Sequence, residues 1–97
     1  MESNRNSDIQ QKVIEIIQKI KTCREISRLS QAELATKAGI SQGFLAMIES
    51  GKKVPTITSV LKICQALEIA PEYLFMTGEQ NRQKVKEEII KKIMTEL

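Results

Sequence analysis

Residues 29–51 read LSQAELATKAGISQGFLAMIESG, and this stretch contains the clearest local structural signals in the chain. Ser30 is followed three residues later by Glu33, which is the spacing of a capping box at a helix N-terminus. Gly39 supplies the left-handed conformation that commonly ends a helix, and Ser41 offers a second N-cap. The stretch therefore predicts two short helices joined by a tight turn that contains a glycine.

The first of these helices is expected over residues 30–38, and the second is expected to end at Gly51. Each has an apolar pair placed as a hydrophobic staple, with Leu29 facing Leu34 and Ile40 facing Leu45. Two short helices around such a turn are typical of a helix-turn-helix.

Apolar residues spaced three and four apart predict further helices on both sides. A first helix is expected to begin at Ser7 or Asp8 and to end near Ser27 or Arg28. Its apolar stripe consists of Ile9, Val13, Ile16, Ile20 and Cys23, widened by Ile14 and Ile17.

After the central stretch, Thr56 is expected to cap a fourth helix, and Pro71 to start a short fifth helix that ends at Gly78. The buried side of the fourth helix is predicted to hold Ile57, Val60, Leu61, Ile63, Cys64 and Leu67. Residues 79–97 predict a charged final helix with one apolar stripe, made of Val85, Ile89, Ile93 and Leu97. No stretch has the alternation of a strand, so the chain is predicted to be all-α.

The composition excludes several classes of protein. The 97 residues suit one small domain, and the absence of histidine excludes an imidazole base, a Ser-His-Asp triad and a His-ligated zinc site. Cys23 and Cys64 lack metal-ligand spacing, and each is expected to be a buried small hydrophobe. No apolar run is long enough for a membrane span, so a cytoplasmic protein is expected. Because the sequence has no histidine, no phosphate-binding glycine loop and no paired carboxylates in a plausible site, an enzyme is not expected, nor is a cofactor, metal, membrane or small-molecule partner. The net charge of +3 is compatible with nucleic-acid binding.

The central stretch, together with Pro55-Thr56, Leu61, Ile63-Cys64, Ala66-Leu67, Ile69 and Tyr73-Leu74, resembles the Cro and cI repressor-type (XRE-like) helix-turn-helix family. The resemblance covers roughly residues 16 to 76. It implies a five-helix, lambda-repressor-like DNA-binding domain, here with an extended first helix and an additional C-terminal helix. The expected organisation is a flexible arm over residues 1–8, the DNA-binding domain over 9–78 and a dimerisation element over 79–97.

The second helix of the motif is expected to place one face in the major groove of DNA. Leu45 and Ile48 face inward by their spacing, and the expected base-reading residues are Ser41, Gln42, Gly43, Ala46 and Met47. The amide of Gln42 can pair with adenine in the major groove, and Met47 can contact a thymine methyl group. These residue types favour a half-site rich in A·T pairs.

The resemblance also implies phosphate contacts, which give affinity and register. The expected residues are Arg24, Gln31, Ser50, Gly51, Lys52 and Lys53, with backbone amides around Ser50 and Gly51 forming part of a phosphate clamp. In addition, Gln31 is expected to brace Gln42, and Arg24 to form an ion pair with Glu49.

Two functions are consistent with these features. The first is a sequence-specific regulator of transcription, a repressor or autoregulator, that binds a palindromic double-stranded operator as a homodimer through Val85, Ile89, Ile93 and Leu97. The second is an antitoxin-like or antirepressor-like module whose main partner is another protein. For the final helix, packing within one chain is the alternative to dimerisation.

Overall fold

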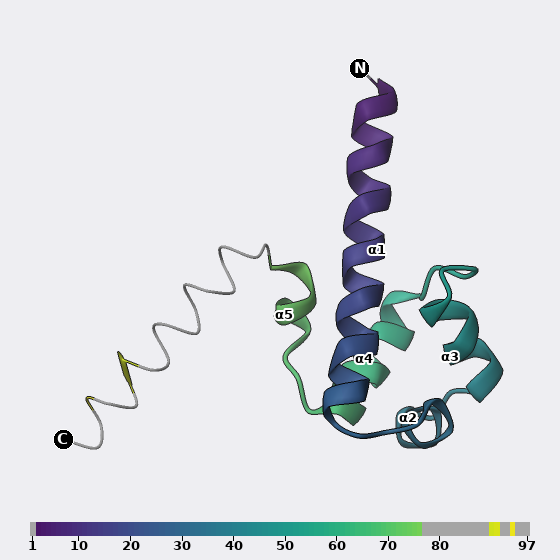
Figure 1. Cartoon of the computed structure of the whole chain (residues 1–97), viewed down its shortest axis with the longest axis vertical. Coiled ribbons are helices and arrows are strands. Elements are labelled where there is room, and N and C mark those ends of the chain that lie inside the picture. The colour runs from purple at the N-terminus through teal and green to yellow at the C-terminus, as the bar shows by residue number, and fades with distance from the viewer. Residues whose placement is uncertain (1, 77–89, 92–93, 95–97) are drawn as a thin grey trace.

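The computed structural model describes residues 2–76, 90–91 and 94. Its helices are α1 (Glu2–Ile26), α2 (Gln31–Ala38), α3 (Gln42–Glu49), α4 (Ile57–Leu67) and α5 (Pro71–Phe75) (Figure 1). The described residues contain no strand, which confirms the all-α class. None of the described helices is long and apolar enough to cross a membrane.

Local signals fix the ends of the central helices. The hydroxyl of Ser30 accepts a hydrogen bond from the Glu33 amide at 3.0 Å, and the Glu33 carboxylate accepts one from the Ser30 amide at 3.0 Å. Gly39 ends α2 with a φ of 70°, and the Ser41 hydroxyl accepts from the amide of Phe44 at the start of α3. The capping box and the glycine turn are therefore confirmed.

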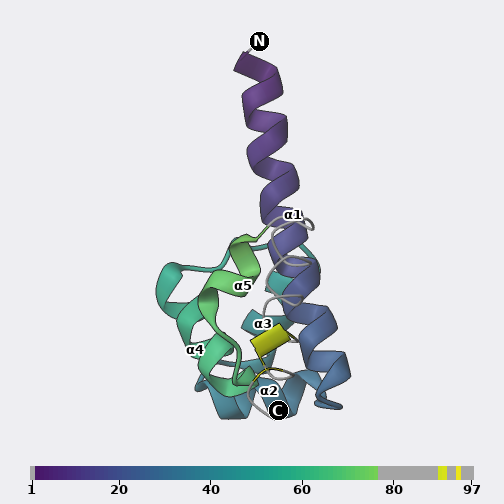
Figure 2. The ribbon, with the colours of Figure 1, turned by 90° about the vertical axis from the view of Figure 1, so that its left-hand side faces the viewer.

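The predicted start of the first helix is wrong, because α1 already includes Glu2. Residues 2–8, which were assigned to a flexible arm, form its first turns. They contain neither glycine nor proline, and extending an existing helix costs much less than starting one. In Figure 2 these turns stand clear of the other helices.

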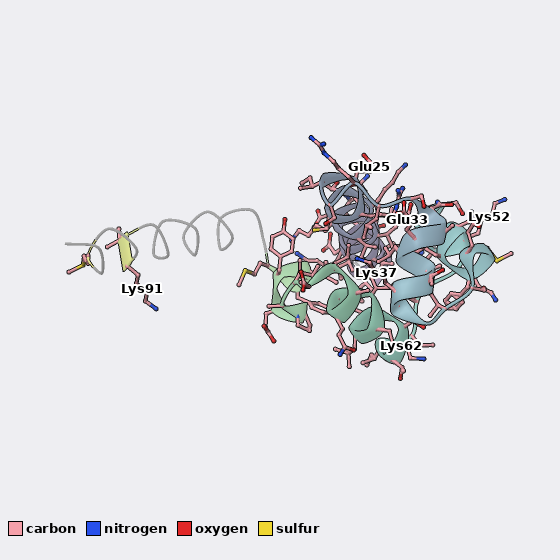
Figure 3. The ribbon with its side chains drawn as sticks, turned by 90° about the horizontal axis from the view of Figure 1, so that it is seen from below. Glu25, Glu33, Lys37, Lys52, Lys62 and Lys91 are labelled. Carbon is pink, nitrogen blue, oxygen red and sulfur yellow. The ribbon has the colours of Figure 1, made fainter. Side chains whose placement is uncertain are left out.

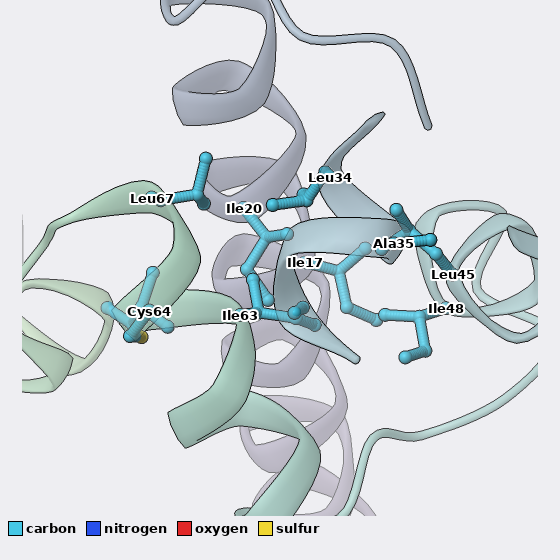
Figure 4. Packing of buried hydrophobic residues seen from close by; sticks show 11 residues of the cluster. Ile17, Ile20, Leu34, Ala35, Leu45, Ile48, Ile63, Cys64 and Leu67 are labelled. Atoms are coloured by element: carbon cyan, nitrogen blue, oxygen red, sulfur yellow. The ribbon is translucent and has the colours of Figure 1, made fainter. Parts of the chain in front are cut away.

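The core lies where the five helices meet, and α2 packs against both α3 and α4. Its largest fully buried side chains are Ile20, Leu34, Leu45, Ile48, Ile63, Leu74 and Cys64 (Figure 4). Leu29 and Ile40, the outer members of the two predicted staples, pack against this core. The fold thus holds α3 by its inner face.

Two residues predicted to be buried, Ile57 and Leu61, are exposed instead, and so are two members of the apolar stripe of the first helix. Ile9 and Ile14 of α1 are 63% and 47% exposed, although Val13 between them packs against the core. Ile57 and Leu61 lie on α4, and the Ile57 side chain is 81% exposed. Their spacing placed them correctly on the apolar side of the helix, but that side borders an open groove.

The predicted helix over residues 79–97 lies almost entirely outside the described residues. The same holds for its four expected dimerisation residues, Val85, Ile89, Ile93 and Leu97. Gly78, the predicted end of the fifth helix, also lies outside them.

Candidate nucleic-acid interface

The two faces of α3 differ sharply in exposure. Leu45 and Ile48 are fully buried, which confirms the predicted inner face. On the outer face the side chains are small or uncharged, and Ala46 is half-buried while Gln42, Gly43 and Met47 are exposed. A helix with this outer face can approach another surface closely.

Two outer positions have specific local properties. The Ser41 hydroxyl is used as the N-cap of α3, since it accepts from the Phe44 amide at 3.0 Å. A Cβ added at Gly43 would meet open space, so packing within the chain does not require glycine there. Glycine at this position therefore removes a side chain from the outer face and leaves the backbone accessible.

Arg24 of α1 is tied to Glu49 at the end of α3, as predicted. Arg24 Nε and Nη2 donate to the two carboxylate oxygens of Glu49 at 2.8 and 3.0 Å, and Nη1 donates to the Leu29 carbonyl at 2.8 Å. The Glu49 side chain is only 2% exposed, so this is not an ordinary surface pair. The hydrogen bond to Glu49 raises the pKa of Arg24 above its usual value, so the guanidinium stays charged.

Gln31, at the start of α2, joins the same cluster. Its Nε2 atom donates to Glu49 Oε1 at 3.1 Å, so one carboxylate connects α1, α2 and α3. This contact with Glu49 was not predicted, and the bracing of Gln42 by Gln31 stays a prediction. Nothing in the sequence spacing pointed to a contact between residues 31 and 49.

The backbone amides of the loop after α3 make hydrogen bonds within the chain. The backbone amides of residues 50–53 donate to carbonyls in the last two turns of α3, at 2.9 to 3.1 Å. Gly51 makes this ending possible with a φ of 80°. The backbone amides of Ser50 and Gly51 therefore complete the helix end, and the prediction that they hold a phosphate is wrong.

The cationic side chains of this loop remain exposed. Lys52 points outward at the end of the molecule away from α5 (Figure 3). The Nζ atom of Lys53 lies 5.6 Å from the centroid of the Phe44 ring, a cation–π distance that orients this lysine beside the start of α3. The sequence did not predict this contact, since the two residues are nine positions apart.

Both thiols are shielded. Cys64 is buried and Cys23 is half-buried, and burial raises the pKa of each above its usual value. The uncharged thiol is therefore the form present near neutral pH, which supports a packing role for both cysteines.

A family model described as helix-turn-helix matches residues 20–74, more than half of the chain. Among the relatives, the uncharacterized HTH-type transcriptional regulator YgzD of Bacillus subtilis is 35% identical over 63 residues, covering 65% of this chain and 96% of YgzD. YqaE, of the same organism and description, is 30% identical over 77 residues, covering 79% of this chain and 65% of YqaE. A further such regulator, y4dL of Sinorhizobium fredii, is 32% identical, and the match spans only 28% of its length.

Solved structures similar to the fold include a controller protein and a repressor. The restriction-modification controller protein C.AhdI from Aeromonas hydrophila has a TM-score of 0.62 and 28% identity, covering 65% of this chain and 96% of C.AhdI. The P22 c2 repressor, solved in complex with a synthetic operator, has a TM-score of 0.56 and 25% identity, covering 61% of this chain and 89% of that one.

Proposed function

Because the chain belongs to the Cro and cI type of helix-turn-helix family, whose members are DNA-binding transcription regulators and not enzymes, we propose that it is a homodimeric repressor or autoregulator of a palindromic operator. The observation that carries the proposal is the mounting of α3. Its inner face is fully buried, its end is fixed by the Arg24–Glu49 pair, and its outer face is free of bulky charged groups. The site of action is the cytoplasm, where the DNA is accessible.

Gln42 is the principal base-reading residue in this proposal. It is the first residue of α3 and is exposed, so its amide can make two hydrogen bonds to the N6 and N7 atoms of adenine. Such a pair contributes about 1–3 kcal/mol of discrimination. Met47 lies on the same face and is suited to a thymine methyl group, and Ser41, Gly43 and Ala46 let the backbone approach the base edges.

Phosphate contacts are assigned to the exposed ammonium groups of Lys52 and Lys53. Arg24 uses three hydrogen bonds within the chain, so two of its five N–H groups remain for a phosphate beside Gln31. Gln31 and Arg24 thereby combine a positioning role with a phosphate contact. These contacts provide affinity without distinguishing one sequence from another.

The salt dependence of DNA binding tests the proposal. Fluorescence anisotropy of the full chain with labelled double-stranded DNA should give a straight line of log K against log salt, with a slope of about −4 to −7 for about 4–8 neutralised phosphates. A flat dependence would contradict DNA as the partner. Weak DNA binding, together with a stoichiometric protein partner that co-purifies, would instead support the antitoxin-like or antirepressor-like function.

A further inference from the structure

An apolar groove of about 230 Å³ lies between α1, α4, α5 and the loop that precedes α4. Val13 and Ile17 form its α1 wall, Val54 and Ile57 its rim, and Leu61 and Phe75 its remaining sides. The side chains of Val54, Ile57, Leu61 and Phe75 are between 49% and 81% exposed. So much contiguous exposed apolar surface on a small domain marks a site that another element covers.

The apolar surface continues beyond the groove along the free part of α1. Ile9 lies one helical turn before Val13 on the same face, and it is 63% exposed. This part of α1 stands clear of the other described helices (Figure 2). An occupant that fills the groove and also covers Ile9 must therefore be an elongated apolar stripe.

The chain leaves α5 on the other side of α1. Lys19 of α1 donates to the carbonyls of Tyr73 and Met76, and its Nζ atom lies 5.2 Å from the centroid of the Tyr73 ring. Tyr73 and Met76 border a hollow together with Glu15, Gln18 and Thr22 of α1, which lie on the opposite side of this helix from Val13 and Ile17. Met76 is thus fastened against a face of α1 directed away from the groove.

The remaining segment of the chain has the composition of such an occupant. Val85, Ile89, Ile93 and Leu97 recur every four residues between charged side chains, a pattern that predicts an amphipathic helix. A helix over residues 79–97 would be about 28 Å long, enough to cover both the groove and the free part of α1. Only Thr77 and Gly78 separate residues 79–97 from Met76. The segment of the same chain therefore follows directly from a residue held on the side of α1 opposite the groove.

We propose that the groove of each chain receives residues 79–97 of a second copy. Reciprocal exchange of this segment gives an interface in which the same two surfaces meet twice about a two-fold axis. This inference rests on the homodimer of the proposed function and specifies how it forms. It places the expected dimerisation residues Val85, Ile89, Ile93 and Leu97 against the partner's α1, α4 and α5.

Cysteine cross-linking between full-length chains tests the exchange. One chain carries Leu61→Cys, the other carries Ile89→Cys and a different affinity tag, and the two are co-expressed and oxidised. We expect a disulfide-linked species that carries both tags. The matched control is Lys91→Cys in place of Ile89→Cys, because position 91 lies about 200° away from position 89 on a helix. That pair, and the unsubstituted chains, should give at least tenfold less of the mixed product.

Other outcomes would overturn the exchange. A doubly substituted chain that closes its own disulfide at monomer mass would show that the groove holds the chain's own segment. A folded pair with no mixed product would show that the segment does not occupy the groove. DNA binding by the unsubstituted chain is measured in parallel. If DNA binding persists without the mixed product, the exchange is wrong and the proposed function stands. If the mixed product forms without DNA binding, the exchange stands and the proposed function is wrong.

Discussion

The inner face of α3 and the first turns of α4 carry the same kind of sequence pattern with opposite outcomes. Leu45 and Ile48 are apolar residues three apart, and both are fully buried. Ile57 and Leu61 are apolar residues four apart, and both are exposed. Spacing shows which side of a helix faces the protein, but not whether the same chain covers that side. The surroundings of α3 are complete within one chain, whereas the groove beside α4 is open.

The largest difference between the two regions is expected in stability. Leu45→Ala and Ile48→Ala should each lower the free energy of unfolding by about 2–5 kcal/mol, because each removes buried methyl groups and leaves a cavity. Leu61→Ala, its matched change in the groove, should cost less than about 1 kcal/mol under conditions where the chain is monomeric. Urea denaturation followed by circular dichroism measures all three. Equal losses at positions 45 and 61 would show that the two regions do not differ.

The carboxylate that joins α1, α2 and α3 should give the next largest effect. Glu49→Ala leaves Arg24 and Gln31 without their shared acceptor in a nearly buried site, at a cost of about 2–4 kcal/mol. Glu25→Ala is the matched control, since Glu25 is an exposed acid beside Arg24 in the sequence. Thermal unfolding of both variants in the same buffer distinguishes them. A Glu49→Ala variant as stable as the control would mean that the cluster does not hold α3.

Substitutions on the outer side should alter DNA binding while leaving stability nearly unchanged. Gln42→Ala should weaken binding to the preferred sequence by about 1–3 kcal/mol per half-site and leave unrelated DNA unaffected. Lys53→Ala should weaken binding to all sequences alike and reduce the salt slope by about one for each lost contact. Anisotropy titrations on preferred and scrambled duplexes measure both. If the two variants behave identically on the two duplexes, the assigned roles are wrong.

The smallest expected effect concerns the capping box of α2. The hydrogen bond from the Ser30 amide, followed by that from its hydroxyl, lowers the pKa of Glu33 below its usual value. Stabilisation from the ionised carboxylate is therefore complete above the usual pKa of glutamate and is lost as the pH falls through the lowered value. In the Glu33→Gln variant, the free energy of unfolding should therefore fall less steeply as the pH is lowered through the acid range. An unchanged acid limb in that variant would show that the box contributes nothing measurable.

Local signals in the sequence were sufficient for much of the fold. Ser30 with Glu33, Gly39, Ser41 and Thr56 set helix ends through contacts between residues no more than a few positions apart. The Arg24–Glu49 pair followed from the family resemblance. Such features are predictable because the interacting groups are close in sequence or recur in many related proteins.

The wrong predictions could have been avoided only with information about the tertiary arrangement of the helices. The exposure of Ile57 and Leu61 depends on which other elements reach them, and a single helix pattern does not contain that information. The contact of Gln31 with Glu49 depends on the angle between α2 and α3. The backbone amides of Ser50 and Gly51 were predicted to bind phosphate, although the end of α3 uses them.

Selection of bound duplexes from a random pool by the full chain tests the central claim most directly, since it reports binding, base preference and half-site spacing together. We expect enrichment of a palindrome whose half-sites lie one helical turn, about 34 Å, apart and are rich in A·T pairs. Enrichment of single half-sites, or no enrichment over the starting pool, would contradict a two-fold regulator that reads DNA through α3.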